Sequence, residues 1–204
     1  MKLVLALLLI ILLCFGVAAA EPAGLGARLA AAAIEQTKYD VRYDPSYRII
    51  PYPGGDVPAD RGVCSDVVVR ALREVGVDLQ QRVHEDISAN FSAYPRLWGL
   101  HRADSNIDHR RVPNLEAYFA RAGAGLPLSL SADDYRPGDI VAWNLRGEAG
   151  FLPHIGVVTD RIGDSGWPLI VHNIGAGPKL EDVLFLWPMT GHYRITLARR
   201  APAS

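Results

Sequence analysis

The chain has few cysteines: only two among its 204 residues, and Cys14 lies inside an apolar run near the N-terminus. Cys64 is then the one cysteine of the remaining chain, so it has no partner for an intrachain disulfide. The pairs of cysteines that hold structural zinc are excluded for the same reason. From the residues we expect neither a bound metal nor another cofactor.

A charge excess of either sign is also missing. The 21 Lys and Arg residues balance 22 Asp and Glu residues, for a net charge of −1, and no basic block is interleaved with aromatic residues. Nucleic acid is therefore not expected as a partner. Repeats and low-complexity tracts are absent beyond the N-terminal run, and the length suits one domain with a sizeable core.

The N-terminal run predicts a secretion signal over residues 1–20. A lysine precedes an apolar stretch at 3–17, and three alanines before Glu21 match a cleavage site. The stretch is shorter than the about 20 residues of a spanning helix, although an uncleaved anchor is the alternative. Leu13 stands where a lipoprotein signal needs a small residue before Cys14. We expect a mature bacterial protein of residues 21–204, periplasmic or secreted, with no membrane anchor.

The hydrophobic spacing predicts helices first and strands afterwards. Helices are expected over residues 24–37, 64–75, 80–93 and 114–122, a long ordered loop over 95–112, and strands over 140–143, 154–160, 169–174 and 192–197. Helices followed by hairpin-linked strands indicate a single α+β domain with an antiparallel sheet.

Cys64 lies where a loop turns into an amphipathic helix. A helix start favours thiolate over thiol, which predicts a reactive, partly exposed cysteine. Cys64 also shares a helical face with Val67, Val68, Ala71 and Val75. The alternative is therefore an inert core cysteine.

Two histidines are expected to meet on a hairpin. If the strands pair about a turn near residue 163, His154 lies opposite His172 at one end of the sheet, with Cβ atoms about 5 Å apart. A base and its orienting group need this arrangement, and a thiol packed against the same end would complete a Cys–His–His site. Alternatively, His154 is a half-buried structural histidine and His172 only ends a strand.

These residues carry a family resemblance. The chain resembles a bacterial family known as domain of unknown function 1287 over nearly all of the expected mature chain. The matching segments are YPGGDVP at 52–58, GVCSD at 62–66, NIDHRRVPN at 106–114, RPGDIV at 136–141, HIG at 154–156 and HNIG at 172–175. The order of these motifs is also similar to that of the NlpC-type papain-fold amidases and peptidases, which implies a papain-like core.

The resemblance implies a thiol-dependent amidase or peptidase that acts on cell-wall (peptidoglycan) peptides. Cys64 would be the nucleophile, His154 the base and later the acid, and His172 the group that orients His154. The backbone N–H groups of Cys64 and Ser65, free at a helix start, would stabilise the oxyanion.

The loop over residues 95–112 is expected to form a wall of the substrate cleft. Arg110 and Arg111 are candidates to hold a substrate carboxylate with two hydrogen bonds each. The alternative is that these arginines are solvated or pair with Asp108.

Two other classes of function stay open. One is a metal-dependent hydrolase using His84, Asp86, Asp108 or His109, although their spacings match no common ligand pattern. The other is an envelope protein that keeps a papain-like shape to bind wall peptides without cleaving them.

Overall fold

The structure, a computed structural model, describes residues 24–196. The expected signal at 1–20 and the end of the last expected strand at Leu197 lie outside the described residues. The helices are α1 (Leu25–Gln36), α2 (Cys64–Glu74), α3 (Leu79–Asn90) and α4 (Val112–Arg121), with 3-10 turns at Phe91–Ala93, Asp108–Arg110, Ala132–Asp134 and Gly147–Ala149. The strands are β1 (Arg42–Tyr43), β2 (Arg61–Gly62), β3 (Ile140–Asn144), β4 (Pro153–Ile162), β5 (Pro168–His172), β6 (Lys179–Glu181) and β7 (Met189–Tyr193).

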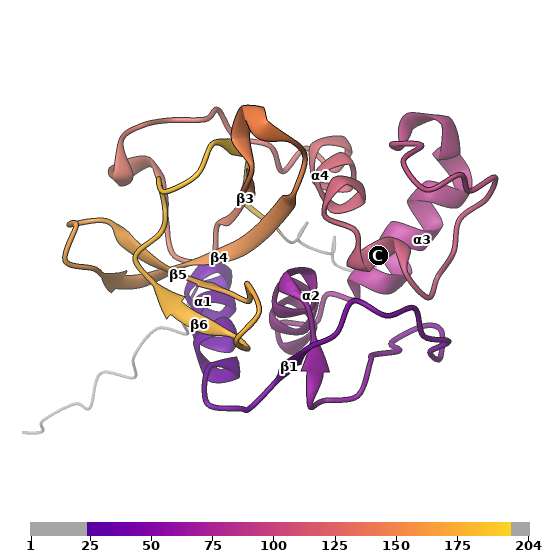
Figure 1. Cartoon of the computed structure of the whole chain (residues 1–204), viewed down its shortest axis with the longest axis horizontal. Helices are drawn as coiled ribbons and strands as arrows, with labels where there is room; N and C mark the ends of the chain where they lie inside the picture. The colour runs from indigo at the N-terminus through magenta and orange to yellow at the C-terminus, as the bar shows by residue number, and fades with distance from the viewer. Residues whose placement is uncertain (1–23, 197–204) are drawn as a thin grey trace, which may run out of the picture.

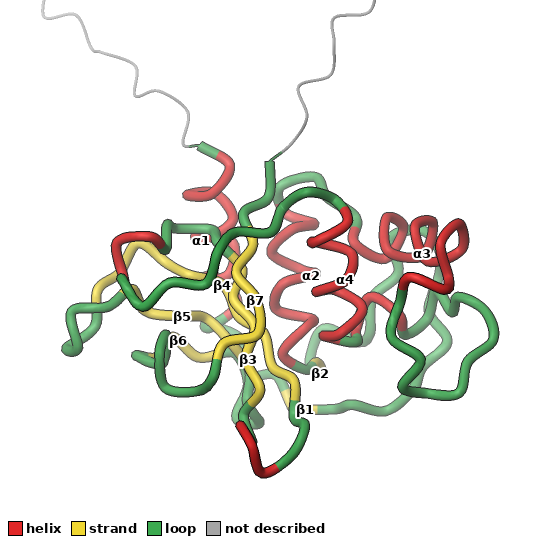
Figure 2. Tube along the Cα trace, turned by 90° about the horizontal axis from the view of Figure 1, so that it is seen from above, coloured by secondary structure: helices red, strands yellow, loops and turns green. Residues whose placement is uncertain are grey.

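The predicted α+β architecture is confirmed. Five antiparallel strands form one sheet in the order β6-β5-β4-β3-β7, and β1 and β2 form a separate short parallel pair. Helices α2 and α4 lie beside the sheet, and α3 lies farther out (Figures 1 and 2). Between residues 24 and 196, no helix is long and apolar enough to cross a membrane.

The sheet separates two hydrophobic clusters, which are named here the helix-side cluster and the far-side cluster. Successive side chains of a strand point to opposite faces. Ile155 and Val157 of β4 accordingly pack with the helices, whereas Val158 packs in the far-side cluster with Trp143. The same alternation assigns His154 to the far side.

Helix α2 begins at Cys64 for local reasons. The backbone of the preceding residue, Val63, is extended, and the Val63 N–H donates a hydrogen bond to the carboxylate of Asp66 at 2.7 Å. Asp66 also places negative charge in the first turn, where the helix dipole favours it. Gly76, with a φ of 87°, ends the helix as expected, because this backbone conformation suits glycine.

Two parts of the sheet differ from the prediction. Strand β6 was not expected, since three residues between turns give too short a pattern to detect. Strand β7 begins at Met189, three residues before the predicted start at His192.

Candidate active site

Cys64 is the first residue of α2 and lines a groove of about 390 Å³. The backbone N–H groups of Ile155, Ser65 and Cys64 itself lie near its sulfur and favour the thiolate, which lowers the pKa of the thiol against the effect of burial. The helix start and strand β4 therefore meet at this thiol.

The expectation of a partly exposed, activated thiol is wrong for this state of the protein. Cys64 is only 5% exposed and belongs to the helix-side cluster. Burial raises the pKa of its thiol to about 12, and the three N–H groups offset only part of that rise. Burial in an apolar environment disfavours the thiolate, and here it outweighs the helix start.

The two histidines do meet. Nε2 of His154 lies 2.8 Å from Nδ1 of His172, and the two rings are edge-to-face. The expected register is wrong, however, because His172 pairs with Gly156 rather than with His154. Next to the turn Ile162 pairs with Pro168, so the hairpin is centred near residue 165 rather than 163, and the irregularity between Val158 and Ile162 reduces only part of this difference. The histidines therefore bond diagonally across the two strands.

Gly156 makes room for this diagonal bond. A Cβ atom built at Gly156 would lie 2.7 Å from Cγ2 of Ile170 and 3.1 Å from Cβ of His172. The first contact forces the Ile170 side chain to move, and the second displaces Cβ of His172 by a few tenths of an ångström, so glycine suits the close approach of β5 at this position.

Glu181 is a further member of the site that sequence reasoning missed. Its Oε2 lies 2.7 Å from Nε2 of His172, at an angle outside that of a regular hydrogen bond. Glu181 lies on β6, which pairs with β5, so an undetected strand carries it. His154, His172 and Glu181 thus form a continuous polar chain.

Two tryptophans cover the histidine pair. Trp143 stacks on His154 at 5.9 Å between ring centroids, and Trp187 lies 6.2 Å from His154 and 6.0 Å from His172. Burial, followed by the neighbouring His172, lowers the pKa of His154 to about 3. Burial also lowers the pKa of His172, against the attraction of Glu181. His154 is therefore neutral at pH 7.

The residues on both sides of His154 border the cysteine. Pro153 lines the same groove as Cys64, and the backbone N–H of Ile155 lies near the sulfur and lowers the pKa of the thiol. His154 itself uses Nε2 for His172. Among the hydrogen bonds of residues 24–196, none engages Nδ1 of His154, which is the nitrogen that remains for proton transfer.

The loop over residues 95–112 lines the groove, as expected, through Trp98, Ile107 and the two arginines. Tyr43 lines it as well and was missed by sequence reasoning, since it comes from an irregular stretch far from Cys64 in the chain. Burial, followed by the nearby Cys64 and Asp66, raises the pKa of the Tyr43 phenol. The phenol is therefore protonated at neutral pH and able to donate a hydrogen bond.

Arg110 does not hold a substrate, contrary to expectation. Its side chain is 2% exposed, and its Nε and Nη2 each donate to the carboxylate of Asp66 at 2.9 Å. Two backbone carbonyls, of Asp44 and Ser46, accept its remaining hydrogen bonds. The Ser65 hydroxyl donates to the Arg110 carbonyl at 2.7 Å, so both side chains fix the loop onto α2.

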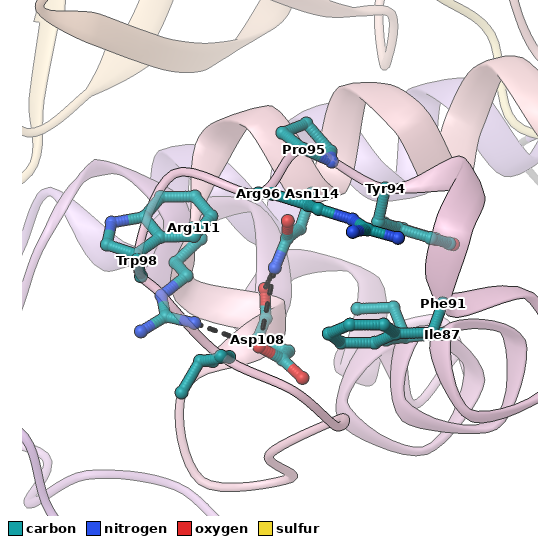
Figure 3. A pocket seen from close by; sticks show the side chains of 10 residues that line it. Ile87, Phe91, Tyr94, Pro95, Arg96, Trp98, Asp108, Arg111 and Asn114 are labelled. Atoms are coloured by element: carbon teal, nitrogen blue, oxygen red, sulfur yellow. Dashed lines mark hydrogen bonds and ion pairs between the residues drawn. The ribbon is translucent and has the colours of Figure 1, made fainter.

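Arg111 is held differently. Its guanidinium lies over the ring of Trp98, 4.2 Å from the centroid, and Nη1 donates to Asp108 at 3.1 Å (Figure 3). Arg111 therefore pairs with Asp108, which was one of the two alternatives to substrate binding. Trp98 and Arg111 line both the groove and a small cavity of about 20 Å³, which Asn114 also lines. These two side chains therefore separate the groove from the cavity.

Of the four residues weighed for a metal site, the two carboxylates have other partners, whereas Nδ1 of His84 and Nδ1 of His109 are buried without a hydrogen-bond partner. Asp86 bonds to Arg121, Tyr94 and Asn90, and Asp108 bonds to Arg111. Over residues 24–196, no three side chains of the types that ligate metals come together in a suitable group.

Comparison with known proteins identifies the family. Residues 30–195 match the family described as "Domain of unknown function (DUF1287)", and the chain belongs to it. The predicted resemblance is thereby confirmed. The chain is also 60% identical over 152 residues to the Escherichia coli (strain K12) protein named "Uncharacterized protein YijF", with 74% of this chain and 73% of that protein covered.

Solved structures are similar at a lower level. NlpC1 from Trichomonas vaginalis is 17% identical over 86% of this chain with a TM-score of 0.47, and NlpC2 from the same organism is 17% identical over 85% with 0.46. The chain spans about half the length of these two proteins, 46% and 48%. An N-acetylmuramoyl-L-alanine amidase from Bacteroides uniformis ATCC 8492 is 12% identical, with 83% of this chain and 97% of that chain covered and a TM-score of 0.49. Such scores carry no weight for function, which depends on the residues of this chain.

Proposed function

We propose that the protein is an exported, thiol-dependent amidase or peptidase that hydrolyses an amide bond in peptidoglycan peptides. One observation carries the proposal. Cys64, at the start of α2, lines a groove, and the two residues that flank His154 lie at the same place: Pro153 lines the groove and the N–H of Ile155 lies near the Cys64 sulfur. That histidine is in turn bonded to a second histidine at 2.8 Å.

The tautomers of the histidine chain follow from its partners. If Nε2–H of His154 donates to Nδ1 of His172, then Nε2–H of His172 faces the carboxylate of Glu181. This assignment gives each of these nitrogens a complementary neighbour and leaves Nδ1 of His154 with its lone pair. Nδ1 is then the base, and His172 with Glu181 orients it and stabilises its protonated form.

The chemistry starts from a neutral thiol and a neutral imidazole. No hydrogen bond of residues 24–196 joins Cys64 to His154, which starts on the other face of the sheet. The proposed step therefore requires Nδ1 of His154 to reach the thiol in the substrate complex. As the Cys64 sulfur attacks the amide carbonyl, its proton then passes to this Nδ1, and a carbon–sulfur bond forms. The N–H groups of Cys64 and Ser65 and the Tyr43 phenol are the donors available to the oxyanion. The carbon–nitrogen bond then breaks, and His154 returns the proton to the leaving amine. Water activated by His154 hydrolyses the thioester and releases the carboxylic acid product.

Export and the wall substrate rest on the sequence. The signal pattern at 1–20 supports export to the periplasm or the exterior. The peptidoglycan peptide is the amide-rich material of that compartment, and the motif resemblance to NlpC-type enzymes supports the same substrate class. A bound metal, cofactor or membrane anchor forms no part of the proposal.

The test is mass spectrometry of purified peptidoglycan fragments incubated with the wild type and with Cys64→Ala, each with and without EDTA. We expect new amine and carboxylate termini with the wild type, no effect of EDTA and no product with Cys64→Ala. Cleavage that survives Cys64→Ala but stops with EDTA would establish the metal-dependent alternative. Tight binding of a fragment without any cleavage would make the protein a non-catalytic wall binder.

A further inference from the structure

The two neighbouring arginines of the groove differ in how much of their charge is compensated. Arg110 donates both nitrogens of its fork to Asp66, whereas Arg111 donates one hydrogen bond to Asp108. Among the hydrogen bonds of residues 24–196, the side chain of Arg111 makes no other. Its remaining nitrogens are also absent from the buried polar atoms that lack partners, so they reach solvent in the groove.

Two carboxylates, those of Asp108 and Asp104, attract the Arg111 guanidinium, and Asp108 also bonds to it. Burial lowers the pKa of Arg111 and raises the pKa of Asp108, so desolvation outweighs their mutual attraction on both sides. At Arg110 the balance is the reverse, because Asp66 and other nearby carboxylates raise its pKa despite burial. Arg111 is thus a partly desolvated cation that an additional anion would stabilise.

The groove offers no competing anion of its own. None of the residues that line it is acidic, since Asp104 and Asp108, the two carboxylates that act on Arg111, are not among them. Apart from the two arginines and Cys64, its walls are tyrosine, proline, tryptophan and aliphatic side chains. Arg111 and Cys64 line the same groove. Trp98 fixes one face of the guanidinium, which leaves its edge for a ligand.

We propose that Arg111, held on Trp98, is a specificity-determining residue that selects substrates with a free carboxylate close to the scissile amide. The proposal rests on the proposed function and names the chemical class of its substrate: a peptide with a free carboxylate near the bond, rather than its carboxamide. The planar fork of arginine binds a carboxylate with two parallel hydrogen bonds. A lysine provides charge without that fork.

The kinetic test compares two wall peptides that differ only in one group, a free carboxylate or a carboxamide next to the cleaved bond. For the wild type we expect kcat/KM to favour the carboxylate by at least about tenfold, the value of one such charged hydrogen-bonded contact. Arg111→Gln should bring the ratio near one by slowing the carboxylate peptide alone. Arg111→Lys, which keeps a charge near Asp108, should retain part of the preference. Arg28→Gln, an exposed position on α1, is the control and should keep the whole preference.

A binding measurement separates this inference from the proposed function. Calorimetry of the non-cleaving Cys64→Ala protein should give tighter binding of the carboxylate peptide, and adding Arg111→Gln should remove the difference. If the wild type cleaves neither peptide but the Cys64→Ala protein binds the carboxylate peptide more tightly, the role of Arg111 in specificity holds and the proposed hydrolase activity is wrong. Equal affinity for the two peptides in Cys64→Ala, or a preference that survives Arg111→Gln, would overturn the role of Arg111.

Discussion

The two faces of the sheet hold the two halves of the candidate site, and they are prepared to different degrees. On the helix side, Cys64 is buried with only backbone N–H groups at its sulfur, and the pKa of its thiol is raised. On the far side, Nε2 of His154 bonds to His172, whose own Nε2 lies 2.7 Å from the carboxylate of Glu181. In the proposed mechanism this difference means that the base is organised in advance, whereas the nucleophile would gain its reactivity only when a proton acceptor and an electrophile are both present.

Removal of the thiol should have the largest effect. Cys64→Ala is expected to lower kcat/KM by roughly 10³-fold or more, because the covalent route is lost while binding and the oxyanion donors remain. The assay is hydrolysis of a peptidoglycan fragment, with thermal unfolding as the check on the fold. Cys64→Ser is the matched variant, and activity above one-tenth of wild type in either would contradict a thiol nucleophile.

Removal of the base should be nearly as damaging. His154→Ala is expected to lose about 10²–10⁴-fold, the usual contribution of a positioned acid–base group. The double variant with His154→Ala and Cys64→Ala should have the same kcat/KM as Cys64→Ala alone, because nucleophile and base act as one unit. Kinetics of the double variant check this, and two losses that multiplied would mean that the residues act independently.

The rest of the histidine chain should matter less. His172→Ala is expected to cost less than His154→Ala, since an orienting group makes no bond to substrate. His172→Asn, which keeps a hydrogen-bond acceptor, should recover part of the loss. Glu181→Gln should cost least, because its side chain is 44% exposed and water replaces part of its charge stabilisation. A larger loss of activity with Glu181→Gln than with His172→Ala would contradict the proposal that Glu181 acts on His154 through His172.

Alkylation probes the contrast between the two faces without a substrate. In the folded protein, iodoacetamide should label Cys64 slowly at pH 7 and faster as the pH rises, because burial raises the thiol pKa to about 12. In denaturant, where a cysteine has a pKa of about 8.5, labelling should be much faster. His154→Ala should leave the folded rate at pH 7 unchanged. Rapid labelling near pH 6 that His154→Ala abolishes would instead indicate a resting thiolate–imidazolium pair.

The smallest expected effect is on stability. His154 has a pKa of about 3 in the folded protein and an ordinary value of 6.5, so the unfolded state binds more protons between these values. The free energy of unfolding should therefore fall as the pH drops below about 6.5, by roughly 2 kcal/mol between pH 7 and pH 5 from this residue. Urea unfolding at both pH values measures it. His154→Gln should lessen the fall, and the control His101→Gln, on an exposed loop, should not.

Local signals made much of this site predictable. The start of α2 at Cys64 and its end before Gly76 follow from hydrophobic spacing and a glycine stop. The meeting of His154 and His172 follows from the hairpin, even with the wrong register, because long side chains reach diagonally across strands.

The remaining features depend on tertiary packing. Whether Cys64 is activated or merely buried depends on how closely α2 packs against β4, which a helical pattern does not contain. The role of Arg110 depends on Asp66, which lies 44 residues away in the chain. Glu181 escaped notice because pairing with β5, rather than its own sequence, makes its short segment a strand.

The glycine opposite His172 has a consequence for the whole family. A single methyl group at Gly156 would displace Ile170 and the backbone of β5 at His172, and so strain the bond between His172 and His154, while leaving both histidines and the cysteine in the sequence. A relative with alanine or a larger residue at this position would keep every chemical group of the candidate site but would need a different spacing of β4 and β5 to join the two histidines. The backbone between the polar residues, and not only their presence in the sequence, therefore determines whether such a site is assembled.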